Sequence, residues 1–164
     1  MKTYIISLLL FFCGFQLSSF AQFSQKELAA IKVLSKGADV IVTGKVAKQK
    51  SSWNKDKTRI YTQATLQVDE YLKGNSGNSV VVTYPGGEVG DVGELYTHMP
   101  RFTNDENVLV FLKKDQKDND YKVYNGEDGK INLIEDAKTG EKVTSSNVQI
   151  KYLKAQIKNY LKEQ

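Results

Sequence analysis

The residues with the clearest capacity for chemistry lie in one glycine-rich connection, residues 85–106. It begins Pro-Gly-Gly-Glu-Val-Gly-Asp-Val-Gly and later contains Pro-Arg-Phe, so it holds both prolines of the chain. Glycines permit close backbone approach, and successive amides beside the guanidinium of Arg101 could bind an anionic or polar group. Alternatively, the glycines only turn tight corners at one end of the fold. The predicted binding residues here are Gly86, Gly87, Glu88, Gly90, Arg101 and Phe102.

This connection is 22 residues long without evident secondary structure, which is long for a compact domain. Segments of this kind are usually functional or disordered. Its apolar residues, among them Leu95, Tyr96 and Met99, favour order because such side chains tend to pack. The phosphate-loop order Gly-x-x-x-x-Gly-Lys-Ser/Thr does not occur in it. We therefore predict an ordered loop that contacts a protein or a glycan.

His98 is the single histidine of the chain, and with Asp91 and Glu94 it could contribute nitrogen and oxygen ligands to a metal ion. Zinc-protease chemistry requires His-Glu-x-x-His, which one histidine cannot supply. The nucleophile motif Gly-x-Ser-x-Gly is also missing from the sequence. The prediction is therefore a protein without catalytic residues, cofactor or metal. The alternative is a metal-dependent or hydrolytic enzyme that uses His98 with loop carboxylates.

Trp53 is the only tryptophan, and it stands in a turn beside Lys50, Lys55 and Lys57. An exposed indole could stack on a sugar or on a partner surface. A tryptophan that folds back over its own hairpin is an equally good interpretation. Trp53 therefore joins the predicted binding residues with both interpretations open.

Residues 1–21 read as a signal peptide. Lys2 precedes an apolar run from Tyr4 to Phe15, and Ser-Phe-Ala at 19–21 offers the small residues that a signal peptidase needs. The run is shorter than the roughly 20 apolar residues that span a bilayer. The prediction is an exported protein, periplasmic or secreted, without a membrane span after cleavage. Cleavage also removes the only cysteine, Cys13, so disulfides and thiolate metal sites are not expected.

Removal of 21 of the 164 residues leaves 143, which predicts a single domain over residues 22–164. Lys2 is the only charge in the leader, so the mature chain keeps 22 of the 23 basic residues against 19 acidic ones. Basic and acidic residues alternate without a basic block, and nucleic acid is therefore not an expected partner.

Helical spacing marks both ends of the mature chain. Ser24 with Glu27 predicts a capping box, and Gly37 would end this first helix in a left-handed conformation. Near the C-terminus, Ser146 with Gln149 predicts a second capping box before an apolar stripe that runs from Ile150 to Leu161.

Between the helices the apolar period changes to two. Residues 40–47 and 60–68 alternate as a long hairpin, with a bulge expected near Asp69-Glu70. Four further strands are expected at residues 80–84, 108–112, 121–124 and 131–134, while residues 136–144 form a polar connection. The predicted fold is mainly β with flanking helices, a small barrel of five or six strands.

Six short motifs follow one another along residues 38–112. They are Ala-Asp-Val-Ile-Val-Thr-Gly-Lys-Val at 38–46, Ile-Tyr-Thr at 60–62, Val-Asp-Glu-Tyr-Leu-Lys-Gly at 68–74, Pro-Gly-Gly at 85–87 with Gly90, Pro-Arg-Phe at 100–102 and Val-Leu-Val-Phe-Leu at 108–112. With these motifs the chain resembles, over about residues 38–134, a largely uncharacterised family of exported bacterial domains, some of which stand beside secreted metalloproteases. A more distant resemblance links the first two strands to netrin-like modules and tissue inhibitors of metalloproteinases.

The distant resemblance implies an OB-like barrel. It does not imply protease inhibition, because those inhibitors chelate zinc through an N-terminal cysteine and the predicted mature chain begins at Gln22. The expected function is an exported non-enzymatic binding module that contacts a protein or glycan through the loop 85–106, with an exported protease as one conceivable partner. A structural envelope protein without a dedicated ligand is the further alternative.

Overall fold

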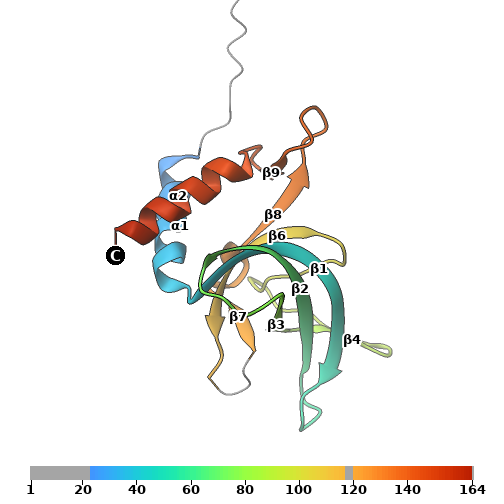
Figure 1. The fold of residues 1–164 in the computed structure, drawn as a ribbon. Helices are drawn as coiled ribbons and strands as arrows, with labels where there is room; N and C mark the ends of the chain where they lie inside the picture. Colours follow the sequence, from blue (N-terminus) through green and yellow to red (C-terminus); the bar gives the residue numbers. More distant parts are fainter. Residues whose placement is uncertain (1–22, 117–119, 164) are drawn as a thin grey trace, which may run out of the picture.

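The computed structural model describes residues 23–116 and 120–163, so the predicted signal peptide lies outside the described residues. No helix in these ranges is long and apolar enough to cross a membrane. The elements are α1 (Gln25–Gly37), β1 (Val40–Trp53), β2 (Ile60–Lys73), β3 (Ser79–Pro85), β4 (Gly87–Val89), β5 (Val92–Glu94), β6 (Asn107–Lys114), β7 (Tyr121–Val123), the 3-10 turn η1 (Gly126–Gly129), β8 (Lys130–Glu135), β9 (Lys142–Thr144) and α2 (Ile150–Lys162) (Figure 1).

Five strands close into a barrel in the order β1-β2-β3-β7-β6, and β6 pairs back with β1. All of these pairings are antiparallel except β3 with β7, which are parallel and aligned at Val82 and Tyr121. β8 continues the sheet from β6, and β9 pairs with β8. The predicted small OB-like barrel with flanking helices is thereby confirmed.

The β1–β2 hairpin curves around the barrel through irregularities in its register. Thr43 is opposite Glu70 while Gly44 is opposite Val68, so Asp69 is an extra residue on β2. The bulge predicted near Asp69-Glu70 is therefore confirmed. Bulges of this kind increase local bend and twist, which a long strand needs when it follows a small barrel.

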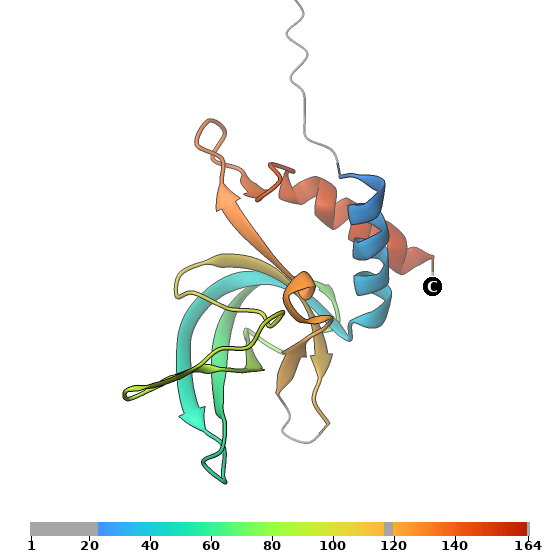
Figure 2. The same cartoon turned by 180° about the vertical axis from the view of Figure 1, so that it is seen from behind.

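The protein has two hydrophobic cores, one on each face of β1 and β6. Val42 and Val110 point into the barrel, whereas their neighbours Ile41 and Phe111 belong to a second core outside it. Helices α1 and α2 lie together over this outer face (Figures 1 and 2). Burial on both faces explains why these strands read as continuous apolar runs. The helical side of the second core is formed by Ile31, Leu34, Leu153 and Ile157.

The two ends of α1 differ in how well they follow the predicted signals. The capping box at its start is confirmed, because Ser24 N donates to Glu27 Oε2 at 2.8 Å and Glu27 N donates to Ser24 Oγ at 3.3 Å. The left-handed end at Gly37 is wrong: the helix is capped by Ala38 in an extended conformation, and Gly37 is not among the positive-φ residues. Gly37 instead provides space, since a Cβ there would overlap the ring of Tyr124.

The capping box predicted for α2 is also wrong. Gln149 occupies the N-cap without a side-chain capping bond, and its Oε1 is buried without a hydrogen-bond partner. The chain turns through Asn147 at φ +59°, which separates Ser146 from the start of the helix. Ser146 Oγ instead donates to Glu27 Oε1 of α1 at 3.4 Å.

Two connections predicted without strands contain short hairpin pairings. β4 and β5 lie within residues 85–106, and β9 lies within the connection 136–144. Each of these strands has three residues, which is too short to show an apolar period of two. They form because their partner strand is adjacent along the chain.

Glu70 on β2 joins the barrel to α2 by accepting from Lys154 Nζ at 2.7 Å and from Lys158 Nζ at 3.1 Å. The hydrogen bond from Lys154 is the main cause that holds the pKa of Glu70 below its usual value. A carboxyl whose pKa is lower in the folded state stabilises the fold at neutral pH, and this contribution is lost as the pH falls through the folded pKa.

We expect Glu70→Gln to lower the free energy of unfolding at pH 7 by about 0.5 kcal/mol, a small value because the pair is partly solvated. The measurement is urea unfolding of both proteins at pH 7 and at a pH below the folded pKa. The difference should vanish at the acidic pH. A difference that stays equal at both values would contradict an electrostatic role for Glu70.

Candidate functional site

The β4–β5 hairpin is fixed to the barrel at its base by hydrogen bonds to β2. Gly86 N donates to Ile60 O at 2.8 Å, and Thr62 Oγ1 donates to Gly86 O at 2.7 Å. From the other strand of the hairpin, Glu94 Oε2 accepts from Ile60 N at 3.0 Å. Gly86 N is therefore already bonded within the fold. The side-chain carboxylate of Glu94 thus accepts from a backbone amide of β2 and closes the base of the hairpin.

Gly87 allows β4 to cross closely over the barrel. Its φ is +130°, and a Cβ at this position would overlap the hydroxyls of Ser51 and Thr62. These two hydroxyls lie 2.9 Å apart and form a hydrogen bond of their own. Gly90 sits at the tip of the hairpin with φ +61°, and a Cβ added there would meet nothing within 4 Å. The loop glycines therefore set the path of the backbone.

After the hairpin, residues 95–101 return across the barrel and are held on both sides. Tyr96 Oη donates to Glu94 Oε2 at 3.0 Å, and the guanidinium of Arg59 lies 6.0 Å from the centre of the Tyr96 ring. Burial, with the hydrogen bond to Glu94, raises the pKa of Tyr96. Further along, Glu127 N of η1 donates to His98 O at 3.1 Å. These contacts indicate an ordered loop.

Phe102 lies inside the barrel, where it packs with the hydrophobic core. The centre of the Phe102 ring is 5.5 Å from the centre of the Tyr84 ring. Lys130 Nζ lies 5.0 Å from the centre of the Phe102 ring. Lys130 is itself paired with Glu106 at 2.9 Å. Phe102 is therefore mainly a core residue, although it also lines the 380 Å³ hollow with the adjacent, exposed Arg101.

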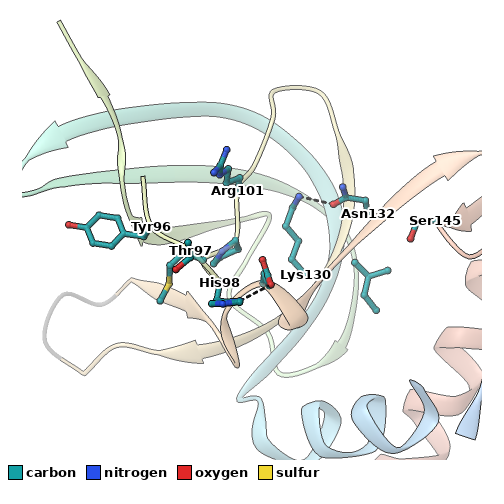
Figure 3. A pocket seen from close by; sticks show the side chains of 11 residues that line it. Tyr96, Thr97, His98, Arg101, Lys130, Asn132 and Ser145 are labelled. Carbon is teal, nitrogen blue, oxygen red and sulfur yellow. Dashed lines mark hydrogen bonds and ion pairs between the residues drawn. The ribbon is translucent and has the colours of Figure 1, made fainter. Parts of the chain in front are cut away.

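Three surface hollows surround residues 96–100, and all three are lined by Tyr96, Met99 and Pro100. Arg101 lines two of them, with volumes of about 740 and 380 Å³. Arg59 lines the third, which measures about 430 Å³. Figure 3 shows the largest hollow, with the Arg101 side chain extending away from His98.

The loop exposes an unusual share of large aliphatic side chains. Leu95 is 71% exposed, Val92 47% and Met99 38%. They are three of the six large hydrophobic residues that are exposed in the described parts of the chain. The other three, Val33, Ile134 and Tyr152, lie on α1, β8 and α2.

The remaining predicted candidates occupy separate positions. Glu88 lines the 380 Å³ hollow with Arg101. Trp53 is half-buried at the end of β1, on the same face as Ser51, and it lines none of the three hollows. Asp91 is exposed at the tip of the β4–β5 hairpin.

The three weak metal-ligand candidates do not form one site. Glu94 is bonded at the base of the hairpin that carries Asp91 at its tip, and His98 Nδ1 lies 3.2 Å from Glu127 Oε1. Within residues 23–116 and 120–163, no group of three or more His, Cys, Asp or Glu side chains could hold a metal ion. The His98 side chain is 85% exposed, with Glu127 as its ion-pair partner.

The sequence interpretation missed Tyr96 and Met99, which line two hollows with Arg101, and Arg59, which lines the third hollow with them. Arg59 belongs to the turn between β1 and β2, and only the fold brings it to the loop. One signal was present, because Arg59 and Arg101 are the only arginines among the 23 basic residues. No model of a known protein family matches this chain, and no curated protein matches it. The geometry of the loop is therefore the basis on which its role is interpreted.

Proposed function

We propose that this chain is an exported, non-enzymatic binding module whose loop 85–106 contacts a protein partner. The single observation that carries the proposal is the exposure of Val92, Leu95 and Met99 together on a loop that hydrogen bonds fix to the barrel. Exposed aliphatic clusters with polar surroundings are typical of protein-binding surfaces. A loop that is ordered before binding loses little conformational entropy when a partner binds.

A protein suits this surface better than a neutral glycan. Sugar-binding sites stack aromatic faces on the ligand, but the ring of Tyr96 is already approached by Arg59, and Trp53 is half-buried away from the hollows. The large hydrophobic residues that the loop exposes, Val92, Leu95 and Met99, are aliphatic and not aromatic. Such side chains insert into apolar pockets of a partner and form the centre of many protein interfaces.

The predicted signal peptide supports a location of the domain and its partner outside the cytoplasm. The resemblance to exported domains that stand beside secreted metalloproteases makes an exported protease one candidate partner. The competing proposals are an enzyme that uses His98 and a structural envelope protein without a ligand. His98→Ala distinguishes the enzyme proposal from the binding module. An enzyme that uses His98 would lose its activity after this change, whereas a binding module would keep its partner.

The test is quantitative capture from envelope and culture-fluid extracts with the chain lacking residues 1–21. We expect Leu95→Ser combined with Met99→Ser to reduce the captured partner about tenfold or more, because central apolar anchors carry much of the binding energy. Mass spectrometry with isotope-labelled extracts gives the ratio between variants.

The matched control is Val33→Ser combined with Tyr152→Ser, which removes two exposed apolar residues from the helices instead of the loop. This control should capture the partner as the wild type does. A partner that is retained by the loop variant and lost by the helix variant would move the interface to α1 and α2. If no captured protein depends on the loop residues, the result would support a structural role without a dedicated ligand.

A further inference from the structure

The only two arginines of the chain lie beside the same five residues, 96–100. Arg59 comes from the β1–β2 turn and lines the 430 Å³ hollow, and Arg101 follows the segment and lines the 740 and 380 Å³ hollows. All three hollows share Tyr96, Met99 and Pro100. The other 21 of the 23 basic residues are lysines, so the fold gathers its arginines at one place.

Neither arginine has a carboxylate partner within the described residues, in contrast to the lysines of the same hollows. Lys122 is paired with Asp115 at 2.5 Å, and Lys130 is paired with Glu106 at 2.9 Å. The salt bridges of the described residues involve nine lysines and His98, and neither Arg59 nor Arg101 takes part in any of them. Apart from the contact of Arg59 with Tyr96, a carboxylate ligand would therefore not have to displace an acidic partner from either guanidinium.

Three carboxylates line the two hollows that contain Arg101. Glu94 Oε2 already accepts from Ile60 N and from Tyr96 Oη, and Glu127 is paired with His98. Glu88 is exposed and lines the smaller of the two hollows. Among the described residues, no acidic side chain lines the Arg59 hollow.

We propose that Arg59 and Arg101 bind the carboxylates of an acidic segment in the protein partner, which lies across residues 96–100 with an aliphatic side chain against Met99. This inference rests on the proposed function and names the chemistry of its partner. A guanidinium presents a rigid fork that matches a carboxylate in a bidentate manner, which a lysine ammonium cannot do. The stacking of Arg59 near the Tyr96 ring partly fixes its orientation before binding.

The charge of the domain has the sign that an acidic segment requires. Without residues 1–21 the chain keeps 22 basic against 19 acidic residues, a net charge of +3, and Lys48, Lys50 and Lys57 of the hairpin whose turn carries Arg59 take part in none of the described salt bridges. A positive field of this kind accelerates the approach of an acidic partner, and the arginines then supply specificity. Exposed aliphatic residues beside the arginines favour a peptide, which can offer carboxylates and apolar side chains together.

The experiment begins with a displayed library of random twelve-residue peptides selected on the chain lacking residues 1–21. Peptides whose binding is lost in the Leu95→Ser, Met99→Ser variant are synthesised, and their affinities are measured by fluorescence anisotropy. Each is tested against Arg59→Lys and Arg101→Lys, which keep the charge and remove the fork. Lys48→Gln combined with Lys50→Gln is the control, because it removes two charges and keeps both arginines.

We expect the selected peptides to combine Asp or Glu with an aliphatic residue and to lose about tenfold or more in affinity with each arginine variant. The control should lose less than either arginine variant. Glu→Gln or Asp→Asn in the peptide should cause a similar loss. Because the chain has only two arginines, its two Nε–Hε NMR signals give a direct readout, and both should shift on titration with the peptide.

The outcomes separate this inference from the proposed function. The carboxylate site would be overturned if the loop-dependent peptides contain no acidic residues, or if their affinity is the same for both arginine variants as for the wild type. The binding module would remain in place. Recovery of no loop-dependent peptide would count against both. Binding of a hexagalacturonate oligosaccharide through the two arginines, without peptide binding, would replace the peptide with an acidic glycan and overturn the inference.

Discussion

Replacement of Phe111 by alanine is expected to lower the free energy of unfolding by about 3 to 5 kcal/mol. Phe111 is the largest fully buried side chain of the described residues, and it lies in the second core between β6 and the helices. Removing its ring leaves a cavity between the sheet and the helices, and the surrounding side chains relax only partly into such a cavity. Urea unfolding at pH 7 measures the change, and the slope of the transition shows whether cooperativity is preserved.

Phe111→Leu is the matched control, since it keeps most of the apolar volume and should cost less than half as much as the alanine variant. Hydrogen exchange gives a second readout. In Phe111→Ala the amides of α2 should lose more protection than those of β2, because the helix is attached to the sheet mainly through this core. A loss of less than about 1 kcal/mol would show that the helices do not depend on Phe111.

Replacement of Gly87 by alanine is expected to lower the free energy of unfolding by about 2 to 5 kcal/mol or to displace the β4–β5 hairpin from the barrel. Two causes act together. The φ of +130° is strained for any residue with a Cβ, and that Cβ would overlap the hydroxyls of Ser51 and Thr62. If the hairpin moves, the bonds between Gly86, Ile60 and Glu94 are lost with it.

Gly90→Ala is the control that separates these causes. Gly90 also has a positive φ, at +61°, but nothing lies within 4 Å of the added carbon. Its cost should be about 1 kcal/mol, from backbone strain alone. Thermal unfolding gives the stabilities, and the backbone NMR shifts of residues 86–96 show whether the hairpin has moved. Equal effects for the two variants would contradict a close contact between Gly87 and the barrel.

Local signals in the sequence predicted the elements whose formation is itself local. The spacing over residues 40–47 and 60–68 predicted the hairpin, whose strands are each 14 residues long in the structure, and the bulge at Asp69 was predicted from the same run. The capping box at Ser24 needs only residues three positions apart. Such features follow from backbone propensity and the period of the apolar residues, without knowledge of the fold.

Tertiary packing decided the features that the sequence did not reveal. Gly37 was interpreted as a helix end, but its purpose is space for Tyr124, which is distant along the chain. Phe102 and Arg101 are both predicted binding residues, yet Phe102 is buried in the barrel core while Arg101 is exposed, and the local sequence does not distinguish the two. The pairing of Arg59 with Tyr96 requires the β1–β2 turn to reach the loop, and no local pattern encodes that distance.

The packing of α1 beside α2 determines how the domain can be displayed. Both helices carry the ends of the described chain, and they lie on one side of the barrel while the β4–β5 hairpin projects from another (Figures 1 and 2). If the domain were attached to a surface through either helix, the β4–β5 hairpin would therefore point away from that surface and remain accessible. Several copies anchored in this way on one surface would present their loops in parallel, and a partner with repeated acidic segments would gain avidity without any new contact.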